Sequence, residues 1–396
     1  LDATKIIARE VVYEDEKKVA GPVDAVQKTT MDDVMAGRAS LDDLIAELTV
    51  DELTEICVGT SRGISGRSIV GAASANVPGA AGDTTSLLLE DRNIRNIILA
   101  DGPAGLRLTP VFRTTADGQM LQSDMMMGDV KLVEGEAIPE DAVTYYQYCT
   151  AIPIGTALAQ SWNLDLIQAV GSIVGKEMKD FNVHLWLAPA MNIHRNPLCG
   201  RNFEYFSEDP LVTGKLAAAV VQGLQSAPVS ACPKHFACNN QEYNRNYNNS
   251  VVSARALREI YLRGFEICIK EAHPKNLMTS YNKINGVWSH YNYQLCTALL
   301  REEWGYTGNV ITDWWMRYAP SPEFPQLRDN GYRVRAQVDV LMPGAKTALS
   351  KSAPNDGSLL ATLGKPDGIT LGELQRTAKN VLRMALRTKF ARQYKD

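Results

Sequence analysis

The sequence NVITDWW at residues 309–315 is the clearest strand in this chain. Its first four residues are rich in β-branched side chains, which is typical of a strand buried on both faces of a parallel sheet. A carboxylate and two indole rings follow where this strand ends. Five more short apolar runs have the same character: 97–100, 183–187, 229–232, 277–280 and 339–342.

Amphipathic helices lie between these runs. In 254–272, apolar residues recur at the spacing of one helix face. Asp209 and Pro210 predict a helix start, because Asp caps free backbone N–H groups and Pro in the first position costs no hydrogen bond. Two capping boxes are predicted, at Thr49 with Glu52 and at Thr370 with Glu373. Alternating strands and helices predict a closed barrel or an open doubly wound sheet.

Polar residues at the strand ends favour the barrel. Functional side chains follow successive runs directly, as they do at the active-site face of a barrel. These clusters are Asp101, 192–201, Lys234-His235, Tyr281-Asn282 and Asp313-Trp314. The sequence has no GxGxxG after the first strand and no GxxxxGK[ST], so a nucleotide-binding sheet is the weaker interpretation. We predict an α/β fold in which a (β/α)8 TIM-like barrel spans 39–392.

Two segments fall outside the alternating pattern. Residues 1–38 are charged and irregular, which predicts an N-terminal arm or linker. Residues 109–150 are long for a connection and contain a Met-rich stretch, 125–127. We expect this segment to be an insertion over the barrel mouth.

Composition excludes several classes of protein. The chain has 396 residues, a formal net charge of −4 and no block of like charges, so it lacks the electrostatic footprint of a nucleic-acid or membrane-surface protein. No apolar run reaches the roughly 18 residues of a transmembrane helix. The sequence opens with Leu1 and not with Met, so we expect a processed chain or a piece of a longer one, and we expect no signal peptide within it. The seven cysteines form no CxxC pair, which predicts free thiols in a reducing cytoplasm. The five histidines are dispersed without HExxH, so we expect no metal site and no cofactor.

Asp313 is the strongest candidate for chemistry. It would lie at the barrel mouth beside Trp314 and Trp315, and sugars present apolar C–H faces to aromatic rings and hydroxyls to charges. The alternative is an Asp that caps the next helix. Lys234-His235 could supply a Schiff-base amine and a general acid or base. The same pair could instead orient a substrate or be merely solvated.

Two more polar residues have plain alternatives. Arg201 stands among acidic residues, and it could fix its loop through ion pairs or aim its donors at sugar hydroxyls and the nucleophile. Asp101 could simply nucleate a turn. Their shared position at one end of one barrel favours a common site.

Six motifs resemble glycoside hydrolase family 3 in their order and spacing. They are ADGPAGLR (100–107), NIHRNPLCGRNFEYFSEDP (192–210), PKHFACNNQE (233–242), MTSYNKINGVWS (278–289), LREEWGYTGNVITDWW (300–315) and DVLMPG (339–344). LTVDELTEICVG (48–59) resembles the family's opening barrel helix, so the resemblance covers about 40–390. It implies a β-glucosidase that hydrolyses terminal non-reducing β-D-glucosyl residues, for example in cello-oligosaccharides. A β-xylosidase of the same family is the alternative.

The resemblance also implies roles for single residues. Asp313 matches the covalent nucleophile of a retaining mechanism, although Thr312 stands where Ser is commoner. Asp101 matches the carboxylate that holds the glucose 4- and 6-hydroxyls, and Trp314 matches the aromatic wall of the aglycone side. The other implied substrate-binding residues are Arg107, Arg201, Lys234, His235, Met278 and Tyr281. Arg201 and Lys234 would keep Asp313 ionised by opposite charge and hydrogen bonding.

The proton donor is the missing part. The family's β-N-acetylglucosaminidases carry an acid/base His in a KHFPGHG-type loop, which is absent here because Ala237 and Cys238 follow Phe236. The glucosidase branch takes its acid/base Glu from an α/β-sandwich domain, for which this chain has no room. The arm at 1–38 and the sequence 145–163 resemble members with reversed domain order. We therefore expect the Glu to come from a sandwich domain or second chain outside these residues.

Two rival interpretations are disfavoured. A Schiff-base aldolase would need an apolar pocket around Lys234, whereas His235 and several Asn residues follow it. A non-catalytic sugar-binding barrel would not need Asp313 together with its Arg and Lys partners.

Overall fold

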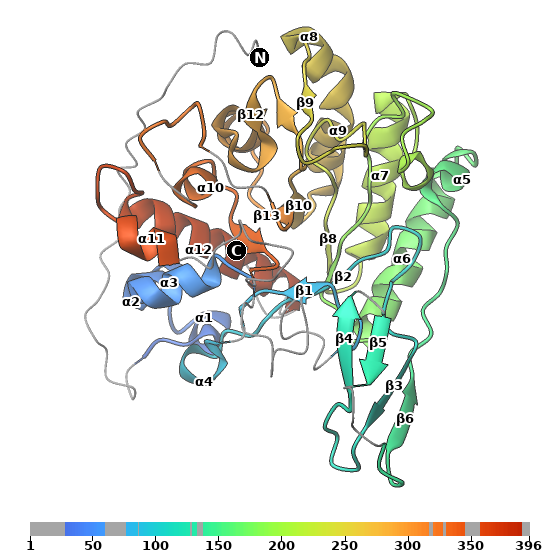
Figure 1. Ribbon diagram of the computed structural model, residues 1–396, viewed down its shortest axis with the longest axis vertical. Coiled ribbons are helices and arrows are strands. Elements are labelled where there is room, and N and C mark those ends of the chain that lie inside the picture. The colour runs from blue at the N-terminus through green and yellow to red at the C-terminus, as the bar shows by residue number, and fades with distance from the viewer. Residues whose placement is uncertain are drawn as a thin grey trace.

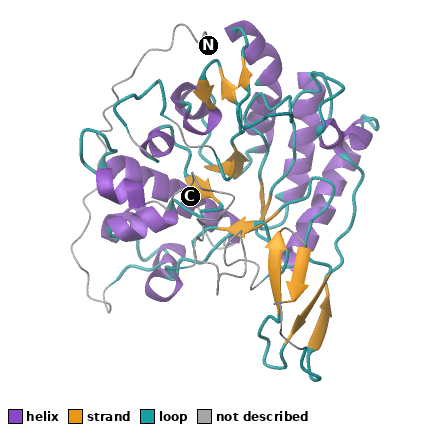
Figure 2. Cartoon of the chain, viewed as in Figure 1, coloured by secondary structure: helices purple, strands orange, loops and turns teal. Residues whose placement is uncertain are grey.

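A computed structural model describes residues 28–59, 77–85, 87–126, 129–132, 138–316, 320–327, 330–344 and 357–389. Short strands form a central wall, and helices lie outside it (Figures 1 and 2). The wall strands are β1 (Gly82–Asp83), β2 (Ile98–Ala100), β7 (Leu185–Trp186), β8 (Ser230–Ala231), β10 (Asn276–Met278), β13 (Asn309–Trp314) and β14 (Val340–Met342). All six predicted strand runs are confirmed, because each overlaps one of these strands.

Hydrogen bonds join the strands in the orders β1-β2-β7-β8 and β10-β13-β14. The gap between β8 and β10 is bridged just beyond β8, where the Met278 amide donates to the Pro233 carbonyl at 3.1 Å. The Phe236 amide donates to the Met278 carbonyl at 2.8 Å. These two bonds make the halves one continuous wall.

The segment 58–59 closes the ring. Val58 bridges Leu341 of β14 in parallel, and Gly59 bridges Thr84, next to β1, in antiparallel. The described residues therefore form a barrel of eight members, counting 58–59 as the first. The predicted TIM-like barrel is confirmed with one change of direction, since β1 runs antiparallel to β2.

Side chains of the wall alternate between two apolar clusters, as the two faces of a strand require. Leu99, Leu185 and Ile311 belong to one cluster, which we call the barrel cluster. Their chain neighbours Ile98, Trp186 and Val310 belong to the other. Both clusters also contain residues of the helices outside the wall.

The outer helices include most of the predicted ones. Their bounds are α2 (Leu41–Glu47), α3 (Val50–Ile56), α4 (Leu89–Arg92), α5 (Gly155–Ala159), α6 (Leu164–Asp180), α7 (Pro210–Leu224), α8 (Ala254–Ala256), α9 (Arg263–Ala272), α10 (Gly331–Arg335), α11 (Gly357–Thr362) and α12 (Leu371–Lys389). Both capping boxes and the Asp209 cap are confirmed by hydrogen bonds. The helix predicted over 254–272 is interrupted by a π-helical segment, η5 (Leu257–Tyr261). A second π-helix, η7 (Gln294–Glu303), precedes β13.

Short 3-10 helices and strands lie in the connections of the ring. They are the 3-10 helices η4 (Asn202–Glu204) and η6 (Ser289–Tyr291) and the strands β9 (Asn249–Ser250), β11 (Lys283–Ile284) and β12 (Val287–Trp288). These three strands form one sheet in the order β12-β11-β9.

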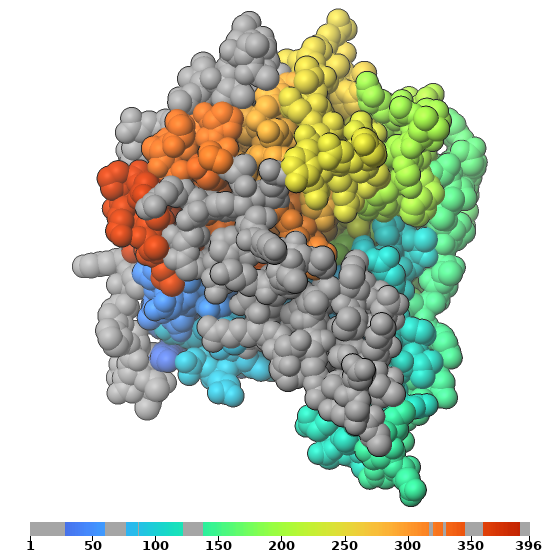
Figure 3. Space-filling model, in the orientation of Figure 1, coloured from blue at the N-terminus to red at the C-terminus, as the bar shows by residue number. Residues whose placement is uncertain are grey.

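The segment 109–150 contains two antiparallel strand pairs. They are β3 (Val111–Thr114) with β6 (Val143–Tyr146) and β4 (Gln122–Met126) with β5 (Asp129–Leu132). The pair β3–β6 projects from the body at the lower right of Figure 3. Its root lies close to β2, because the Ile152 amide donates to the Ala104 carbonyl at 3.0 Å. That it covers the mouth stays a prediction.

The N-terminal arm is described only from residue 28 onward. There, α1 (Met31–Met35) begins with a capping box at Thr30 and buries Met31 and Val34 against the barrel cluster. This part is therefore a packed helix, and not the irregular segment expected. Residues 1–27 lie outside the described part of the chain.

All seven cysteines are free thiols, as predicted. Six are buried and Cys149 is partly exposed. No helix among the described residues is long and apolar enough to cross a membrane.

Candidate active site

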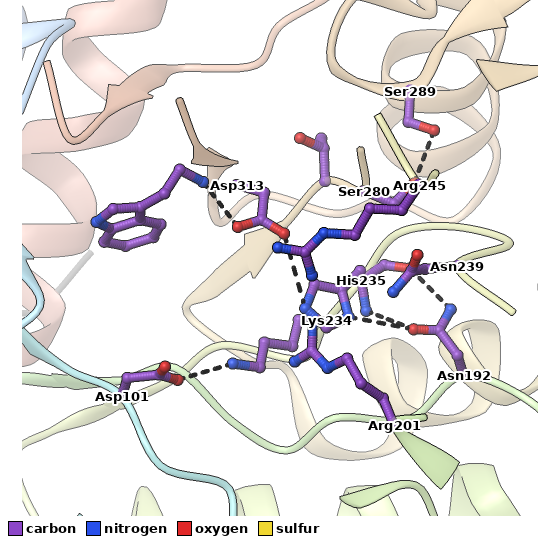
Figure 4. A network of polar contacts seen from close by, with 12 residues as sticks. Asp101, Asn192, Arg201, Lys234, His235, Asn239, Arg245, Ser280, Ser289 and Asp313 are labelled. Atoms are coloured by element: carbon purple, nitrogen blue, oxygen red, sulfur yellow. Dashed lines mark hydrogen bonds and ion pairs between the residues drawn. The ribbon is translucent and has the colours of Figure 1, made fainter. Parts of the chain in front are cut away.

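All nine residues predicted for the site line one cavity of about 580 Å³. Eight of them lie at or after the carboxyl ends of strands. Asp101 and Arg107 follow β2, and Lys234 and His235 follow β8. Met278 ends β10 and Tyr281 follows it, and Asp313 and Trp314 end β13. The ninth, Arg201, directly precedes η4. Figure 4 shows how the polar members converge from different strands. The structure thus brings these side chains together, and their individual roles stay predictions.

Asp101 is held by two cations. Its Oδ1 accepts a hydrogen bond from Lys234 Nζ at 2.9 Å, and its Oδ2 pairs with Arg107. Burial opposes ionisation of Asp101, but the positive charges of Lys234 and Arg107 outweigh it and lower its pKa to about 2. Asp101 is therefore a firmly ionised hydrogen-bond acceptor. Lys234, engaged by this carboxylate, lacks the apolar surroundings of a Schiff-base lysine.

The turn that carries Asp101 depends on a close backbone approach. Gly102 has φ +110°, and a Cβ there would lie 2.0 Å from the Gly105 carbonyl oxygen. The Trp186 indole N–H donates to the Gly102 carbonyl at 2.9 Å. This turn aims the carboxylate at Lys234 and Arg107, which the strand alone would not do.

Asp313 is buried at the end of β13. Its Oδ1 accepts a hydrogen bond from the Trp314 amide at 2.7 Å. Its Oδ2 is buried without a hydrogen-bond partner among the described residues, and His235 Nε2 lies 3.8 Å away. One carboxylate oxygen is thus oriented by the backbone. The Tyr281 side chain lies close to this carboxylate, since burial and the charge of Asp313 raise the pKa of Tyr281 well above its ordinary value.

The charge state of Asp313 reflects competing effects. Burial raises its pKa above the ordinary value, while the positive charges of Arg245, Arg201 and Lys234 lower it. The net direction is upward. The prediction that Arg201 and Lys234 keep Asp313 ionised is therefore right about the sign of their effect, but burial outweighs it.

His235 is held as a neutral ring. Burial lowers its pKa well below the ordinary value, and the charges of Arg201, Lys234 and Arg245 act in the same direction. Asn192 fixes its backbone: Asn192 Nδ2 donates to the His235 carbonyl at 2.9 Å, and the His235 amide donates to Asn192 Oδ1 at 2.9 Å. A neutral imidazole in this position can donate or accept one hydrogen bond to a substrate hydroxyl.

Arg201 forms the ion pair that the sequence offered as one alternative, and it also lies near the nucleophile candidate. Its Nε pairs with Glu204, which fixes the loop, and its guanidinium lies in the cavity close enough to Asp313 to lower the pKa of that carboxyl. Glu204 also lines the cavity, and its second oxygen, Oε2, is buried without a hydrogen-bond partner among the described residues.

Arg245 is the site residue that sequence reasoning missed. Its guanidinium carbon lies 4.2 Å from the Tyr281 ring centroid, and its Nη1 pairs with Glu242 at 2.9 Å. Its charge is the first of those that lower the Asp313 pKa. The one available signal was an acid and a base spaced three residues apart, Glu242 and Arg245, in an otherwise Asn-rich loop.

Two indole rings follow the nucleophile candidate. Trp314 is 6% exposed, and its Nε1 donates to the Ala81 carbonyl at 2.8 Å, so most of its ring packs in the barrel cluster. Trp315 also lines the cavity and has a left-handed backbone, φ +51°. Met278 contributes apolar lining to the same cavity. Within the described residues there is no group of three or more His, Cys, Asp or Glu side chains that could hold a metal ion.

Comparisons with known proteins agree with this geometry. A Beta-glucosidase of Ruminococcus albus is 36% identical over 359 residues, which are 90% of this chain and 33% of that protein. An Exo-alpha-(1->6)-L-arabinopyranosidase of Bifidobacterium longum is 36% identical over 304 residues, 76% of this chain and 34% of that protein. The chain spans about a third of the length of these curated relatives.

Solved structures share the fold as well. The structure of beta-glucosidase 3B from Thermotoga neapolitana in complex with alpha-D-glucose matches with a TM-score of 0.73 and 34% identity, covering 90% of this chain and 44% of that chain. Residues 75–357 match the family model described as the Glycosyl hydrolase family 3 N terminal domain. The chain therefore belongs to glycosyl hydrolase family 3.

Proposed function

We propose that this chain is the catalytic barrel of a retaining β-glucosidase that removes terminal non-reducing β-D-glucosyl residues. The observation that carries the proposal is one cavity with two differently prepared carboxylates. Asp101 is saturated by Lys234 and Arg107, whereas Asp313 keeps one oxygen without a hydrogen-bond partner among the described residues. Environments that differ in this way give identical side chains different tasks.

In this proposal, Asp101 binds hydroxyls of the terminal sugar and Asp313 attacks its anomeric carbon. The bond from that carbon to the leaving oxygen breaks as the leaving oxygen takes a proton. Water then attacks the glycosyl-enzyme, which releases the sugar with retained configuration and frees Asp313. His235, Arg201 and Arg245 supply donors and positive charge around the reacting centre.

In this proposal, the proton donor comes from outside the described cavity lining. The carboxyl groups that line the cavity are Asp101, Glu204 and Asp313. The pKa of Asp101 is lowered to about 2, and Glu204 is paired with Arg201, so both carboxylates are already engaged by cations. The relatives extend well beyond the matched region. We infer that an acid/base Glu on an α/β-sandwich domain or a second chain completes the site.

Trapping the covalent intermediate tests the nucleophile directly. A 2-deoxy-2-fluoro-β-glucoside with a dinitrophenolate leaving group needs no proton donor for the first step, so the 396-residue chain alone should react. Mass spectrometry of the digested protein should find the label on Asp313, and the Asp313→Asn variant should take up none. A label on another residue would refute the assignment.

Substrate choice tests the missing acid. Leaving-group protonation typically contributes about a hundredfold to ten-thousandfold. The chain alone should therefore cleave dinitrophenyl glucoside and leave cellobiose almost untouched, and adding the sandwich polypeptide should restore cellobiose turnover. Efficient cellobiose turnover by the isolated chain would show that a carboxylate within these residues supplies the proton.

A second candidate concerns the sugar. The arabinopyranosidase relative and the β-xylosidase alternative both involve sugars without the 6-hydroxymethyl group. Comparing kcat/KM on nitrophenyl β-glucoside, β-xyloside and α-L-arabinopyranoside under one set of conditions separates these possibilities. A preference for β-glucoside supports the main proposal.

A further inference from the structure

The outer side of α6 carries exposed apolar side chains. Leu166 and Ile173 are each half-exposed, and Ala169 between them is exposed as well. The opposite side of the helix is packed, because Gly171 and Gly175 lie against the backbone of α7. In Figure 1, α6 lies at the right-hand edge of the helices, beyond α7. The three exposed residues therefore form a stripe on the side of α6 that does not face α7.

This stripe has the spacing of a helix–helix seam. Leu166, Ala169 and Ile173 follow one another at steps of three and four residues, which places them along one line of the helix surface. The small side chain at the middle of the line allows a second helix to approach closely. Apolar side chains with this spacing normally face a core or another helix. The seam is thus formed but stays exposed.

Exposed aromatic rings extend the stripe at both ends. Trp162 lies just before α6 begins and is 76% exposed. Near the other end, Glu177 Oε1 accepts a hydrogen bond from the Thr150 amide at 2.8 Å. This bond holds the segment that carries Tyr148, whose ring is also exposed. Extended apolar patches are uncommon on monomers and mark interaction sites.

Two exposed charges lie along one edge of the stripe. Asp165 is in the first turn of α6 and Lys176 follows 11 positions later, which is about three helical turns. The midpoint of these two charges is at position 170.5, and the midpoint of Leu166 and Ile173 is at 169.5. One residue of offset is only about 1.5 Å along a helix. The charges and the apolar side chains are therefore nearly symmetric about one point.

We infer that this face of α6 forms a two-fold dimer in which the helices of two copies pack antiparallel. A two-fold axis through the common midpoint sets Leu166 of each copy against Ile173 of the other copy. The same axis sets Asp165 of each copy beside Lys176 of the other copy, so opposite charges meet twice. The surface is thus complementary to itself in shape and in charge.

The aromatic ends agree with this register. Position 162 lies as far before the midpoint as position 177 lies after it. Trp162 of one copy is therefore level with Glu177 of the other copy, beside which Tyr148 is held through Thr150. A parallel pair of helices would place the charged edges of the two copies on opposite sides of the contact, where the opposite charges could not meet.

The contact is small, because it consists of one helix and its flanking rings from each copy. Interfaces that bury less than about 1,200 Å² are typical of weak and transient complexes. We therefore expect monomers in dilute solution, at about 1 µM, and dimers at roughly 0.1 mM and above. Sedimentation velocity of the 396-residue chain across this range measures the association.

An added charge on the stripe tests the surface. Ile173→Asp should weaken the association at least about tenfold, because the dimer would bury an unpaired carboxylate. Ile260→Asp is the matched control, since Ile260 is 41% exposed on η5 and Ile173 is 50% exposed on α6. The control should associate as the unaltered chain does. Circular dichroism should show the same fold for both variants.

A charge exchange tests the antiparallel register. Asp165→Lys and Lys176→Asp should each weaken the association about fivefold at low salt, because both symmetric contacts become repulsive. The double variant Asp165→Lys/Lys176→Asp should associate as the unaltered chain does, because each copy again offers opposite charges to the other. A double variant that associates no better than the single variants would refute the antiparallel pairing.

Two further outcomes would overturn the inference. One is a chain that stays monomeric throughout the concentration range, or a dimer that Ile173→Asp leaves intact. The other is a monomeric chain that binds a separately produced α/β-sandwich polypeptide and loses this binding in Ile173→Asp. That result would assign the exposed face of α6 to a contact between domains of one protein.

Discussion

Asp101 and Asp313 share one cavity but not one environment. Asp101 accepts from Lys234 at 2.9 Å and pairs with Arg107, and its pKa is lowered to about 2. Asp313 has a backbone amide on one oxygen, no hydrogen-bond partner on the other among the described residues, and a raised pKa. The nearest basic side chain, His235, is neutral, and its Nε2 lies 3.8 Å from Asp313 Oδ2.

This contrast shows how a barrel separates binding from reaction. Direct ion pairs stabilise a carboxylate and make it less nucleophilic, whereas more distant charges keep it usable without occupying its lone pairs. The cations around Asp313 act through space, and those around Asp101 act through contact. Each of the following experiments removes one side of this difference.

The largest effect is expected for Asp313→Asn. The amide can still accept from the Trp314 amide, so the local fold should persist, but it cannot form the glycosyl-enzyme. The kcat for aryl β-glucosides should fall by at least about a thousandfold. Circular dichroism should show an unchanged fold. A folded variant with near-normal kcat would remove Asp313 from the mechanism.

Asp101→Ala should act on the sugar rather than on the reaction centre. If Asp101 holds two glucose hydroxyls, a glucoside loses two charge-assisted hydrogen bonds and a xyloside loses one. With about 1.5–3 kcal/mol for each bond, kcat/KM should fall by roughly tenfold to a hundredfold more for the glucoside. Steady-state kinetics on the two nitrophenyl glycosides measure the ratio. Equal losses would contradict this role.

The ion pairs of Asp101 also predict a pH-dependent stability. Its pKa is about 2 in the folded chain against an ordinary 3.8, so the ionised form stabilises the fold at a pH above the ordinary value. This contribution, about 2 kcal/mol, is lost as the pH falls from about 4 to about 2. Urea unfolding of the chain and of Asp101→Asn should converge over that range. Asp165→Asn, exposed at the start of α6, should show no such convergence.

The smallest effect is expected for Arg245→Met. Arg245 lowers the pKa of Asp313, so its loss should raise that pKa and move the acidic limb of the pH–rate profile to higher pH. A shift of about one pH unit is the usual size for a nearby charge. Arg255→Met, on the exposed start of α8, is the matched control. An unshifted limb would mean that Arg245 serves only to hold Tyr281 in place.

Sequence patterns predicted the parts of this molecule that depend on local chemistry. The six apolar runs became strands because a buried wall demands continuous apolarity, and the nine site residues converged because they follow parallel strands. The other two members of the ring, 58–59 and β1, contain two residues each and no apolar run, so only their pairing with β14 and β2 reveals them.

Electrostatics was less predictable than position. The raised pKa of Asp313 comes from burial by the closed barrel, which no short motif encodes. Arg245 reaches Tyr281 through the path of an irregular loop, held by its pair with Glu242. Neither effect follows from residue spacing along the chain.

The reversed direction of β1 changes how many strands end at the active-site face. In a barrel of eight parallel strands, every strand ends at the same face. Here β1 enters from that face and leaves at the other, where Asn96 Nδ2 donates to Asp83 Oδ2 at 2.7 Å. Among the eight described members, seven therefore end at the mouth. β1 is the described member whose carboxyl end lies on the opposite face, where it cannot supply a side chain to the active site.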